Sequence, residues 1–408
     1  MDGVKPLAGA GVSGGLLSGV RVIEAARILA GPFCGQTLGD LGAEVIKLER
    51  PGEGDDTRRW GPPFVGSLSA YFLACNRNKR SVTLDLMHPD GQAVLHRLLS
   101  LSDVLLENFR TDSLPKLHLT PAELLSRHPR LIVCSISGYG RTGPMAEVPG
   151  YDFAVQAQSG LMSITGPVAG PPCKVGVAVA DVLTGLYAAV AVLAALHARQ
   201  RSGHGYAIDL SLLDCAVAAQ VNVAQAYLST GRVPARQGNA HLQIVPYELF
   251  ATADGWLVLN VGNDKQWAAF CQVAGVPHWA DDPAYQTNQA RVQHRDRLIP
   301  QVAQLLKQRT TAEWESLLAG AGVPHARVRD LAEVFADPQV LSRGMRVQVR
   351  DPHGQPVDLL GSVFHINGQA PPPPSMPPAL GADTDAVLSR LLGLDAEQIA
   401  RLRQANVV

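Results

Sequence analysis

The sequence predicts an α/β protein with two domains, a large one built on a mainly parallel sheet and a smaller one of mixed α+β structure. In the first half of the chain, short runs rich in β-branched residues alternate with helical patterns, which is typical of βαβ units. From about residue 220 this alternation gives way to a hairpin and a series of helical stretches. Because 408 residues exceed what one small core organises, two domains are expected.

The elements of the large domain follow one another at short intervals. Pro32 suits the first turn of the first helix, and Gly42 is a natural end for that helix. Since the strands of βαβ units run parallel, their carboxyl ends meet at one edge of the sheet, where ligands usually bind. The expected strands are residues 20–24, 43–49, 80–86, 103–109 and 131–138, and the expected helices are residues 31–41 and 89–101.

A long apolar stretch, residues 182–198, directly follows Asp181. It is rich in alanine, contains a histidine and has only about the minimum length of a membrane span. We therefore expect a buried core helix, and no membrane among the partners of the chain.

The smaller domain begins with a strong hairpin signal. Residues 247–251 and 256–260 read as strands, and they flank Asp254-Gly255, a dipeptide favoured in two-residue turns. Further elements are expected as helices at residues 264–274, 291–307 and 312–319, a second hairpin over 345–366, a stiff proline segment at 371–374 and a last helix at 384–392.

The composition excludes several classes of protein. Lys and Arg number 35 against 36 Asp and Glu, so the net charge is −1 and the basic face that nucleic acid requires is missing. The basic residues are scattered, which disfavours a membrane-surface patch. The six cysteines lie far apart without a CxxC pair, as expected of reduced thiols in a cytoplasmic protein. The first 19 residues lack the pattern of a secretory signal.

Two familiar ligand-binding patterns are incomplete. Residues 9–14 match GxGxxG, but no strand precedes them and a strand follows where a helix is required. At the first strand–helix turn the three glycines are missing, and Pro32 removes an amide donor that would hold a pyrophosphate, which disfavours a dinucleotide. Cys34 near this turn is either a reactive thiol or, as we favour, a buried structural one. The twelve histidines include no HExxH, and we expect no metal site.

Asp181 is the most informative single residue. Its position alone favours an ordinary helix N-cap, in which the carboxylate accepts backbone N–H bonds. The alternative is a carboxylate nucleophile, because an aspartate with a pKa of ~3.9 is ionised at neutral pH and needs no partner base. In that reading the N-terminus of the helix holds the carboxylate ionised and steadies a developing oxyanion or thiolate.

Short stretches of recognisable sequence run in order from about residue 17 to the C-terminus. They are Ala30-Gly31-Pro32, residues 41–50, Asn78-Lys79-Arg80-Ser81, Glu107-Asn108-Phe109, residues 135–140, Gly150-Tyr151-Asp152, Ile164-Thr165-Gly166, the segment that ends at Asp181, and Pro377-Pro378 leading into Leu380-Gly381. Each is weak alone, but together their order and coverage resemble the class III CoA-transferases, a family that also includes α-methylacyl-CoA racemases.

The resemblance implies an architecture and an assembly. The large domain is then Rossmann-like, the small domain is α+β, and a C-terminal segment returns to the large domain. We place these parts at residues 1–222, 223–344 and 345–408. The resemblance also implies an interlocked homodimer, in which two chains are threaded through each other.

The same resemblance implies a chemistry. Asp181 matches the nucleophile of the family, which forms an anhydride with the acyl group of a donor and then a thioester with CoA. CoA is accordingly a co-substrate, and no cofactor is bound permanently. A glycine-rich flap that keeps water from the reactive intermediates corresponds to Gly238, Asn239, Ala240 and His241, although locally this segment could equally be a plain loop. The CoA contacts carried over are Ala30, Arg50, Leu84, Asn108, Phe109, Lys116 and Tyr151.

Departures from the family pattern narrow the reaction. A Gln of the formate-specific members is Leu29 here, which disfavours formate or oxalate. The racemases use a His where this chain has Tyr151, and a phenol with a pKa of ~10 is a poor base at neutral pH. CoA transfer is therefore favoured over two alternatives, racemisation of a 2-methylacyl-CoA and acyl-CoA binding without catalysis. Four segments resemble members that act on dicarboxylates, namely residues 150–152, 238–241, 244–247 and 262–264. We therefore expect small carboxylic acids as partners, a dicarboxylate acceptor and a donor such as succinyl-CoA.

Overall fold

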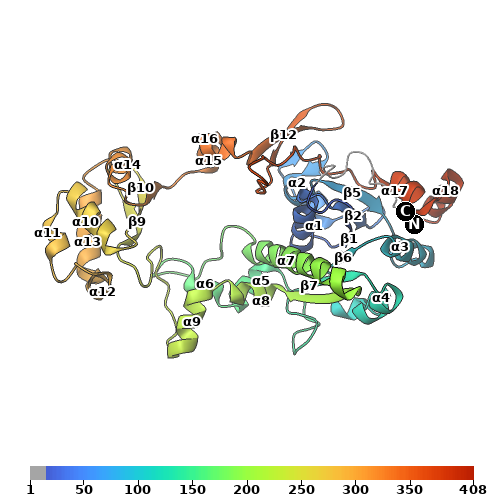
Figure 1. Cartoon of the computed structure of the whole chain (residues 1–408), viewed down its shortest axis with the longest axis horizontal. Helices are drawn as coiled ribbons and strands as arrows, with labels where there is room; N and C mark the ends of the chain where they lie inside the picture. Colours follow the sequence, from blue (N-terminus) through green and yellow to red (C-terminus); the bar gives the residue numbers. More distant parts are fainter. Residues whose placement is uncertain (1–14) are drawn as a thin grey trace. The chain divides into compact units, whose positions relative to one another are not determined.

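The computed structural model describes residues 15–408, which form two units (Figure 1). The first unit comprises the chain up to Leu161 together with Val175–Arg232 and Asp337–Val408, and the second comprises Met162–Lys174 and Val233–Ala336. The observed boundaries after Arg232 and Ala336 differ from those expected after residues 222 and 344. The GxGxxG pattern at residues 9–14 lies outside the described residues.

The first unit is built on a six-stranded sheet in which all neighbouring strands are parallel. The strand order is β5-β2-β1-β6-β7-β8, which corresponds to the order 3-2-1-4-5-6 of a doubly wound Rossmann sheet. The parallel sheet is thus confirmed, although its sixth strand was missed. The strands are β1 (Arg21–Ala25), β2 (Glu44–Glu49), β5 (Lys79–Thr83), β6 (Val104–Glu107), β7 (Ile132–Ser137) and β8 (Tyr206–Ser211).

Helices cover both faces of this sheet (Figure 1). Val22 packs with the helices of one face and Ile23 with those of the other, because successive side chains of a strand point to opposite faces. Val104 and Leu105 divide in the same way. The helices are α1 (Ala30–Asp40) and α7 (Val179–Ser202) on one face, and α3 (Pro89–Ser100), α4 (Pro121–Arg127), α17 (Thr384–Leu392) and α18 (Ala396–Gln404) on the other.

The C-terminal residues protect one edge of the sheet. β5 is an edge strand, so the backbone N–H groups on its outer side need partners from outside the sheet. The Ser81 N–H donates to Oδ2 of Asp383 at 3.0 Å, and the Thr83 N–H donates to Oγ1 of Thr384 at 3.1 Å. α17 therefore begins where it covers β5.

α7 is the longest helix and carries the apolar stretch that follows Asp181. Among the described residues it is the one helix long and apolar enough to cross a membrane, which is weak evidence because core helices of soluble proteins pass the same test. One side packs against α1 and the sheet. Leu186, Tyr187 and Val190 on the other side are 41%, 46% and 64% exposed, so the expected core helix is only half covered by its own chain.

Short elements surround this framework in the first unit. They are η1 (Asp56–Arg59), β3 (Phe64–Val65), β4 (Leu68–Ser69), α2 (Ala70–Cys75), η2 (Thr111–Ser113), α5 (Asp152–Gln158), α8 (Leu212–Ala218), α9 (Val221–Thr230), α16 (Pro338–Ser342) and the hairpin of β12 (Arg346–Arg350) with β13 (Pro356–Leu360), while α6 (Leu161–Ile164) begins at the boundary with the second unit. The predicted C-terminal hairpin is confirmed. The helix predicted to be the last is followed by α18, which starts with a capping box formed by Asp395 and Gln398.

The second unit packs helices against an antiparallel sheet of three strands in the order β11-β10-β9. Its core contains Trp267, Phe270 and Trp314, and the predicted hairpin around Asp254 is confirmed. The single helix predicted at residues 291–307 is two helices, because His294 leaves the helical conformation with ψ at 22°. The elements are β9 (Tyr247–Ala251), β10 (Trp256–Asn260), α10 (Asp264–Val273), α11 (His278–Asp281), α12 (Asn288–Gln293), α13 (Arg295–Leu306), α14 (Thr311–Gly320), β11 (His325–Arg327) and α15 (Leu331–Ala336).

Candidate active site

The sheet of the first unit has its switch point between β1 and β6, from which the strand order runs outward in both directions. In doubly wound sheets, ligands bind in the crevice beyond the carboxyl ends of the strands at this point. The chain leaves β1 into Arg27 and leaves β6 into Asn108 and Phe109. Asn108 ties the two loops together, because its Oδ1 accepts the Arg27 N–H at 3.0 Å and its Nδ2 donates to the Arg27 carbonyl at 2.9 Å.

Two cavities open at this crevice, one of about 350 Å³ and one of about 450 Å³. Arg27 and Phe109 line both cavities. The smaller one is also lined by the predicted CoA contacts Arg50, Leu84 and Lys116. The larger one is lined by the remaining predicted residues, namely Ala30, Asn108, Tyr151 and Asp181. The structure therefore brings the predicted nucleophile and all seven predicted CoA contacts to one edge of the sheet.

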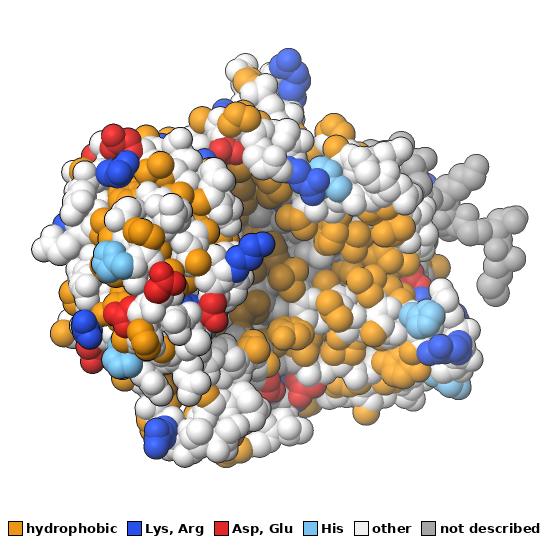
Figure 2. All heavy atoms as spheres, turned by 60° about the vertical axis from the view of Figure 1, so that its left-hand side comes forward, with side chains coloured by type: hydrophobic (Ala, Val, Ile, Leu, Met, Phe, Trp, Pro, Cys, Tyr) orange, Lys and Arg blue, Asp and Glu red, His pale blue; other side chains and the backbone are white. Residues whose placement is uncertain are grey.

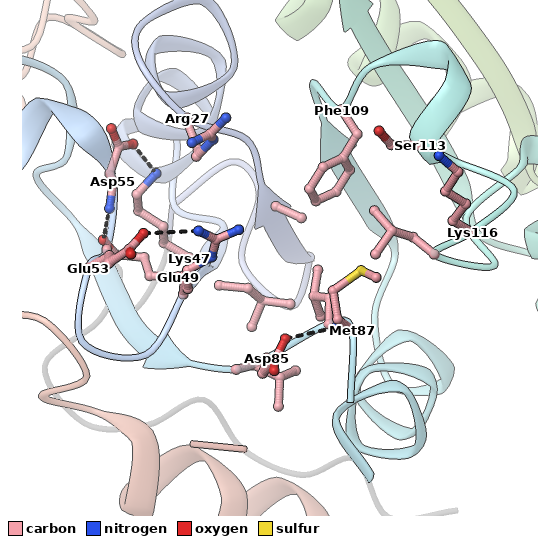
Figure 3. A pocket seen from close by; sticks show the side chains of 17 residues that line it. Arg27, Lys47, Glu49, Glu53, Asp55, Asp85, Met87, Phe109, Ser113 and Lys116 are labelled. Atoms are coloured by element: carbon pink, nitrogen blue, oxygen red, sulfur yellow. Dashed lines mark hydrogen bonds and ion pairs between the residues drawn. The ribbon is translucent and has the colours of Figure 1, made fainter. Parts of the chain in front are cut away.

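The smaller cavity has cationic groups on opposite walls (Figure 3). Phe109, Ser113 and Lys116 lie on one side of the view, and Arg27 lies on the other side above a buried cluster of charged residues. Arg50 pairs with Glu53 at 3.0 Å, but this ion pair is exposed and therefore stabilises the fold little, which leaves the guanidinium group accessible. The cavity is thus suited to a ligand with an apolar body and anionic groups.

A buried charge cluster lies beneath the turn that follows β1. Glu24, Lys47 and Lys79 are completely buried, and each lysine ammonium pairs with the Glu24 carboxylate at 3.0 Å or less. The ammonium group of Lys47 donates to the Ala26 carbonyl and that of Lys79 to the Pro32 carbonyl, both at 2.8 Å. Because breaking a buried ion pair is costly, these bonds hold the turn in one conformation.

The same turn contains a strained residue. Ile28 has φ at +73°, a conformation that β-branched residues rarely adopt and that the surroundings must enforce. The Ile28 N–H points at the Asp55 carboxylate, at 3.3 Å from each oxygen. Burial alone would raise the pKa of Asp55, but the ammonium group of Lys47 and several hydrogen bonds lower it to about 2. A permanently charged acceptor thus fixes the backbone two residues before Ala30.

Asp181 lies in the first turn of α7, three residues after the N-cap Ala178. The N-cap interpretation is therefore wrong, since the helix starts earlier than the sequence pattern indicated. The side chain is half-buried and accepts a hydrogen bond from the backbone of Ala30. Burial, reinforced by the charge of Asp152, raises the pKa of Asp181 to about 7 despite that hydrogen bond. The pKa of Asp181 is thus raised although the residue lies in the first turn of α7, because desolvation outweighs the helix dipole.

Sequence reasoning missed several residues around the site. Arg27 lines both cavities, and its place directly after a strand at the switch point was the available signal. Arg141 holds the loop after β6, since its Nη2 contacts both oxygens of Glu107 at 2.9 and 3.0 Å and its Nη1 donates to the Phe109 carbonyl at 2.6 Å. Burial raises the pKa of Glu107, although Arg141 opposes the shift.

The predicted flap lies in the second unit, where it is tethered by arginines. Arg236 donates to the Gly170 carbonyl at 2.7 Å, and Arg295 donates to the His241 carbonyl at 2.7 Å. The imidazole of His241 also lies 5.3 Å from the ring of Tyr247, measured between centroids. The flap is therefore held within its own unit, and its role over the reaction stays a prediction.

The cysteines and potential metal ligands add no second reactive centre to the part of the chain described. All six cysteines are free, and five are buried. Burial raises the pKa of Cys34 well above its usual range, so this thiol is a structural one. Within residues 15–408, no group of three or more His, Cys, Asp or Glu side chains could hold a metal ion.

A doubly wound sheet with a carboxylate and two cavities at its switch point defines an α/β protein of the kind that binds ligands beyond the carboxyl ends of its strands. Residues 17–384 match the sequence description of CoA-transferase family III. The chain belongs to this family and is an enzyme, as the sequence predicted.

Curated relatives and a solved structure agree with this assignment. The chain is 48% identical over 349 residues to a succinate–glutarate CoA-transferase of Agrobacterium fabrum, covering 83% of this chain and 86% of the relative. It is 40% identical to the succinyl-CoA:glutarate CoA-transferase of Homo sapiens, covering 100% of this chain and 91% of the relative. A crystal structure of a CAIB/BAIF family protein from Brucella suis superposes with a TM-score of 0.81 at 42% identity, covering 92% of this chain and 99% of the other.

Proposed function

We propose that this protein transfers coenzyme A from an acyl-CoA donor, such as succinyl-CoA, to a dicarboxylate acceptor, such as glutarate. The observation that carries the proposal is the pair of cavities, in which Asp181 opens onto one and the predicted CoA contacts line both. The relatives named for succinate and glutarate support the choice of dicarboxylates.

The two cavities match the two ends of an acyl-CoA. The nucleotide end occupies the smaller cavity, where Lys116 and Arg50 meet its phosphates and Leu84 contacts the adenine. The pantetheine arm passes Arg27 and Phe109, which both cavities share, and delivers the thioester to Asp181. Asn108 contributes by fixing the backbone of Arg27, since both ends of its amide are bonded there.

The first half of the reaction releases the donor acid. The ionised carboxylate of Asp181 attacks the thioester carbonyl, the C–S bond breaks, and CoA thiolate leaves behind an anhydride between the acyl group and Asp181. The thiolate then attacks the Asp181 carbonyl carbon of that anhydride. This step forms an aspartyl–CoA thioester and expels the donor as a free carboxylate, so no proton is gained or lost.

The second half repeats these steps in reverse with the acceptor. The acceptor carboxylate attacks the aspartyl thioester and displaces CoA thiolate, which gives a second anhydride. The thiolate attacks the acceptor carbonyl, so the new acyl-CoA forms and Asp181 returns as a carboxylate. Because anhydrides react with water, the pocket must be closed during these steps, and the segment Gly238–His241 is the proposed flap.

A homodimer is part of the proposal. Leu186, Tyr187 and Val190 lie within about one turn of α7 and are exposed together, whereas exposed apolar residues on a monomer are usually scattered. Figure 2 shows that hydrophobic side chains gather over one part of the face in view. A second copy of the chain, interlocked with the first, is the proposed cover. The six free cysteines support the cytoplasm as the proposed location, because thiols stay reduced there.

The deciding experiment mixes the protein with succinyl-CoA and a panel of acids, and reads the acyl-CoA products by mass spectrometry. We expect glutaryl-CoA or a related dicarboxyl-CoA, a hydroxylamine-trappable adduct on Asp181, and loss of both in Asp181→Asn. The matched control is Asp395→Asn, which alters a capping carboxylate of α18 that lines neither of these cavities. Full activity of Asp181→Asn would refute the proposed nucleophile.

Two alternatives give different results in the same assay. A racemase would exchange the α-hydrogen of a 2-methylacyl-CoA for deuterium from solvent without acyl exchange, but Tyr151 lines the cavity where that branch has its histidine. A binding protein without catalysis would bind CoA and give no adduct. Absence of acyl exchange with every dicarboxylate would count against the proposed function.

A further inference from the structure

The first turn of α7 lacks a capping side chain of its own. The N-cap is Ala178, which offers no hydrogen-bond acceptor beyond its backbone. The capping acceptor comes instead from a different helix, because Asp152, the first residue of α5, binds the first turn of α7. Its Oδ1 accepts the Ala180 N–H at 2.8 Å and lies 3.4 Å from the Asp181 N–H. A carboxylate from α5 thus binds the backbone of the residue that carries the proposed nucleophile.

The second oxygen of Asp152 is fixed as well. Its Oδ2 accepts a hydrogen bond at 2.7 Å from Nε2 of Gln156, a side chain that is completely buried one turn further along α5. The other end of this amide, Oε1, accepts the Val175 N–H at 2.9 Å. Asp152 and Gln156 therefore bind both ends of the segment that runs from Val175 into α7, so Asp152 has little freedom to move away from Asp181.

The charges that face Asp181 come from several elements. The charge of Asp152 of α5 raises the pKa of Asp181, and the charge of Asp181 in turn raises the pKa of Tyr71 of α2. The Ala30 N–H of α1 donates a hydrogen bond to Asp181. Arg27 and Arg141 line the same cavity, but their guanidinium groups pair with Asp56 at 2.8 Å and with Glu107 at 2.9 Å. Arg110 lies at the exposed rim and pairs with Asp112, and Glu147 also lines the cavity.

We propose that Asp152 is a positioning residue of the CoA-transfer reaction, whose carboxylate fixes the first turn of α7 through the Ala180 and Asp181 N–H groups and places a negative charge beside the backbone of Asp181. The inference rests on the proposed function, since it presumes that Asp181 attacks the thioester. A serine, threonine or asparagine would cap the helix without placing a negative charge beside another carboxylate. A charged cap is also favoured by the helix dipole, so the pH profile of the reaction is the readout that separates a structural cap from a role of the charge.

A more basic carboxylate has two consequences for the reaction. Once ionised, it is a stronger nucleophile, because nucleophilicity rises with basicity. It is also protonated over more of the acidic range, so the rate should fall below neutral pH. Burial and the charge of Asp152 together place this transition at a pKa of about 7. Removing the charge alone should move the acidic limb of the rate profile by about one pH unit to lower values.

The test compares three variants of Asp152 over pH 5–9 with saturating succinyl-CoA and acceptor. Asp152→Asn keeps an oxygen for the Ala180 N–H but loses the charge and the acceptor for Nε2 of Gln156. We expect the rate at pH 6 divided by the rate at pH 8 to rise from about 0.1 in the wild type to about 0.5 in the variant. These are the ratios of the ionised fractions for a carboxylate whose pKa is about 7 and about 6, respectively. Asp152→Ala also loses the acceptor and should lower kcat at pH 8 by at least about tenfold.

The third variant separates charge from position. Asp152→Glu keeps the charge but displaces the carboxylate by one methylene, so it should keep the acidic limb near pH 7 and lose kcat at all pH values. Because Asp152 lines neither cavity of the active site, the Kd of CoA, measured by calorimetry, should stay within about twofold in all three variants. Asp395→Asn, a capping carboxylate elsewhere, should leave both the profile and kcat unchanged.

The outcomes distinguish this inference from the function on which it rests. An inactive Asp181→Asn together with an unshifted profile of Asp152→Asn would overturn the role of Asp152 and leave the nucleophile in place. A parallel loss of rate at every pH in Asp152→Asn and Asp152→Ala would reduce Asp152 to a structural cap. An active Asp181→Asn would overturn both. If Asp152→Asn fails to fold, Asp152→Glu remains as a test. A shift of the acidic limb of its rate profile away from pH 7 would equally overturn the proposal.

Discussion

The raised pKa of Asp181 should make the stability of the protein depend on pH in a way that one substitution removes. The fold raises this pKa from 3.8 to about 7, chiefly by burial, so the folded state favours the protonated form. Stability from such a group is fully present below the unfolded pKa and is lost as pH rises through the folded pKa. At pH 8 the ionised Asp181 therefore destabilises the fold, and Asp181→Asn should remove that cost.

The size of the effect follows from the two pKa values. The difference between about 7 and 3.8 is roughly 3 pH units, and each unit corresponds to about 1.36 kcal/mol, which gives an upper bound of about 4 kcal/mol. Asp181 is only half-buried, and screening by water reduces the figure to about 2 kcal/mol. The advantage of the Asn variant in free energy of unfolding should thus grow by about 2 kcal/mol between pH 4 and pH 8.

Urea unfolding followed by circular dichroism at pH 4, 5, 6, 7 and 8 and constant ionic strength measures this difference. Comparing the variant with the wild type at each pH cancels the titration of the groups that do not interact with Asp181. Asp395→Asn, which changes a capping carboxylate of α18, is the matched control and should show no gain at pH 8. A difference that stays constant across the range, or an Asn variant that is less stable at pH 8, would refute the reasoning.

Three further predictions concern the crevice and its support. Lys116→Ala should raise the Kd of CoA about tenfold and weaken its salt dependence in calorimetry, and an unchanged Kd at low salt would exclude a phosphate contact. Gly35→Ala should lower the melting temperature, with a loss of about 2–4 kcal/mol, because the new Cβ would lie 1.9 Å from Oε2 of Glu24; a wild-type melting curve would contradict this. Asn108→Ala should lower kcat/KM about tenfold by freeing the Arg27 backbone, and equal values of kcat/KM would show that the loop keeps its place without the amide.

The sequence was informative wherever a local pattern determined the structure. β-Branched runs identified most strands of the large sheet, and the Asp254-Gly255 dipeptide identified the hairpin of the second unit. β8 (Tyr206–Ser211) was missed although Tyr206, Ile208 and Leu210 alternate with smaller or polar residues, a period of two that is typical of a strand. α18 was missed although its capping box is visible in the sequence. These omissions were avoidable.

The electrostatics of the site could not be predicted in the same way. The position of Asp181 ahead of an apolar helix was visible, but its pKa depends on burial and on Asp152, which approaches from a different helix. The buried cluster of Glu24, Lys47 and Lys79 likewise joins residues of three strands that are far apart in the sequence. Such electrostatic interactions exist only after the chain has folded, and no periodic pattern in the sequence predicts them.

The cover over β5 ties the completion of the large sheet to a segment that is synthesised much later than β5. Ser81 bonds to Asp383, and about 300 residues separate the two. The ribosome must therefore synthesise the whole second unit before the start of α17 is available to bind the outer edge of β5. Until then the nascent protein offers an open strand that a neighbouring nascent chain or a chaperone could occupy. Shortened products that stop before α17 should for this reason be prone to aggregate in the cell.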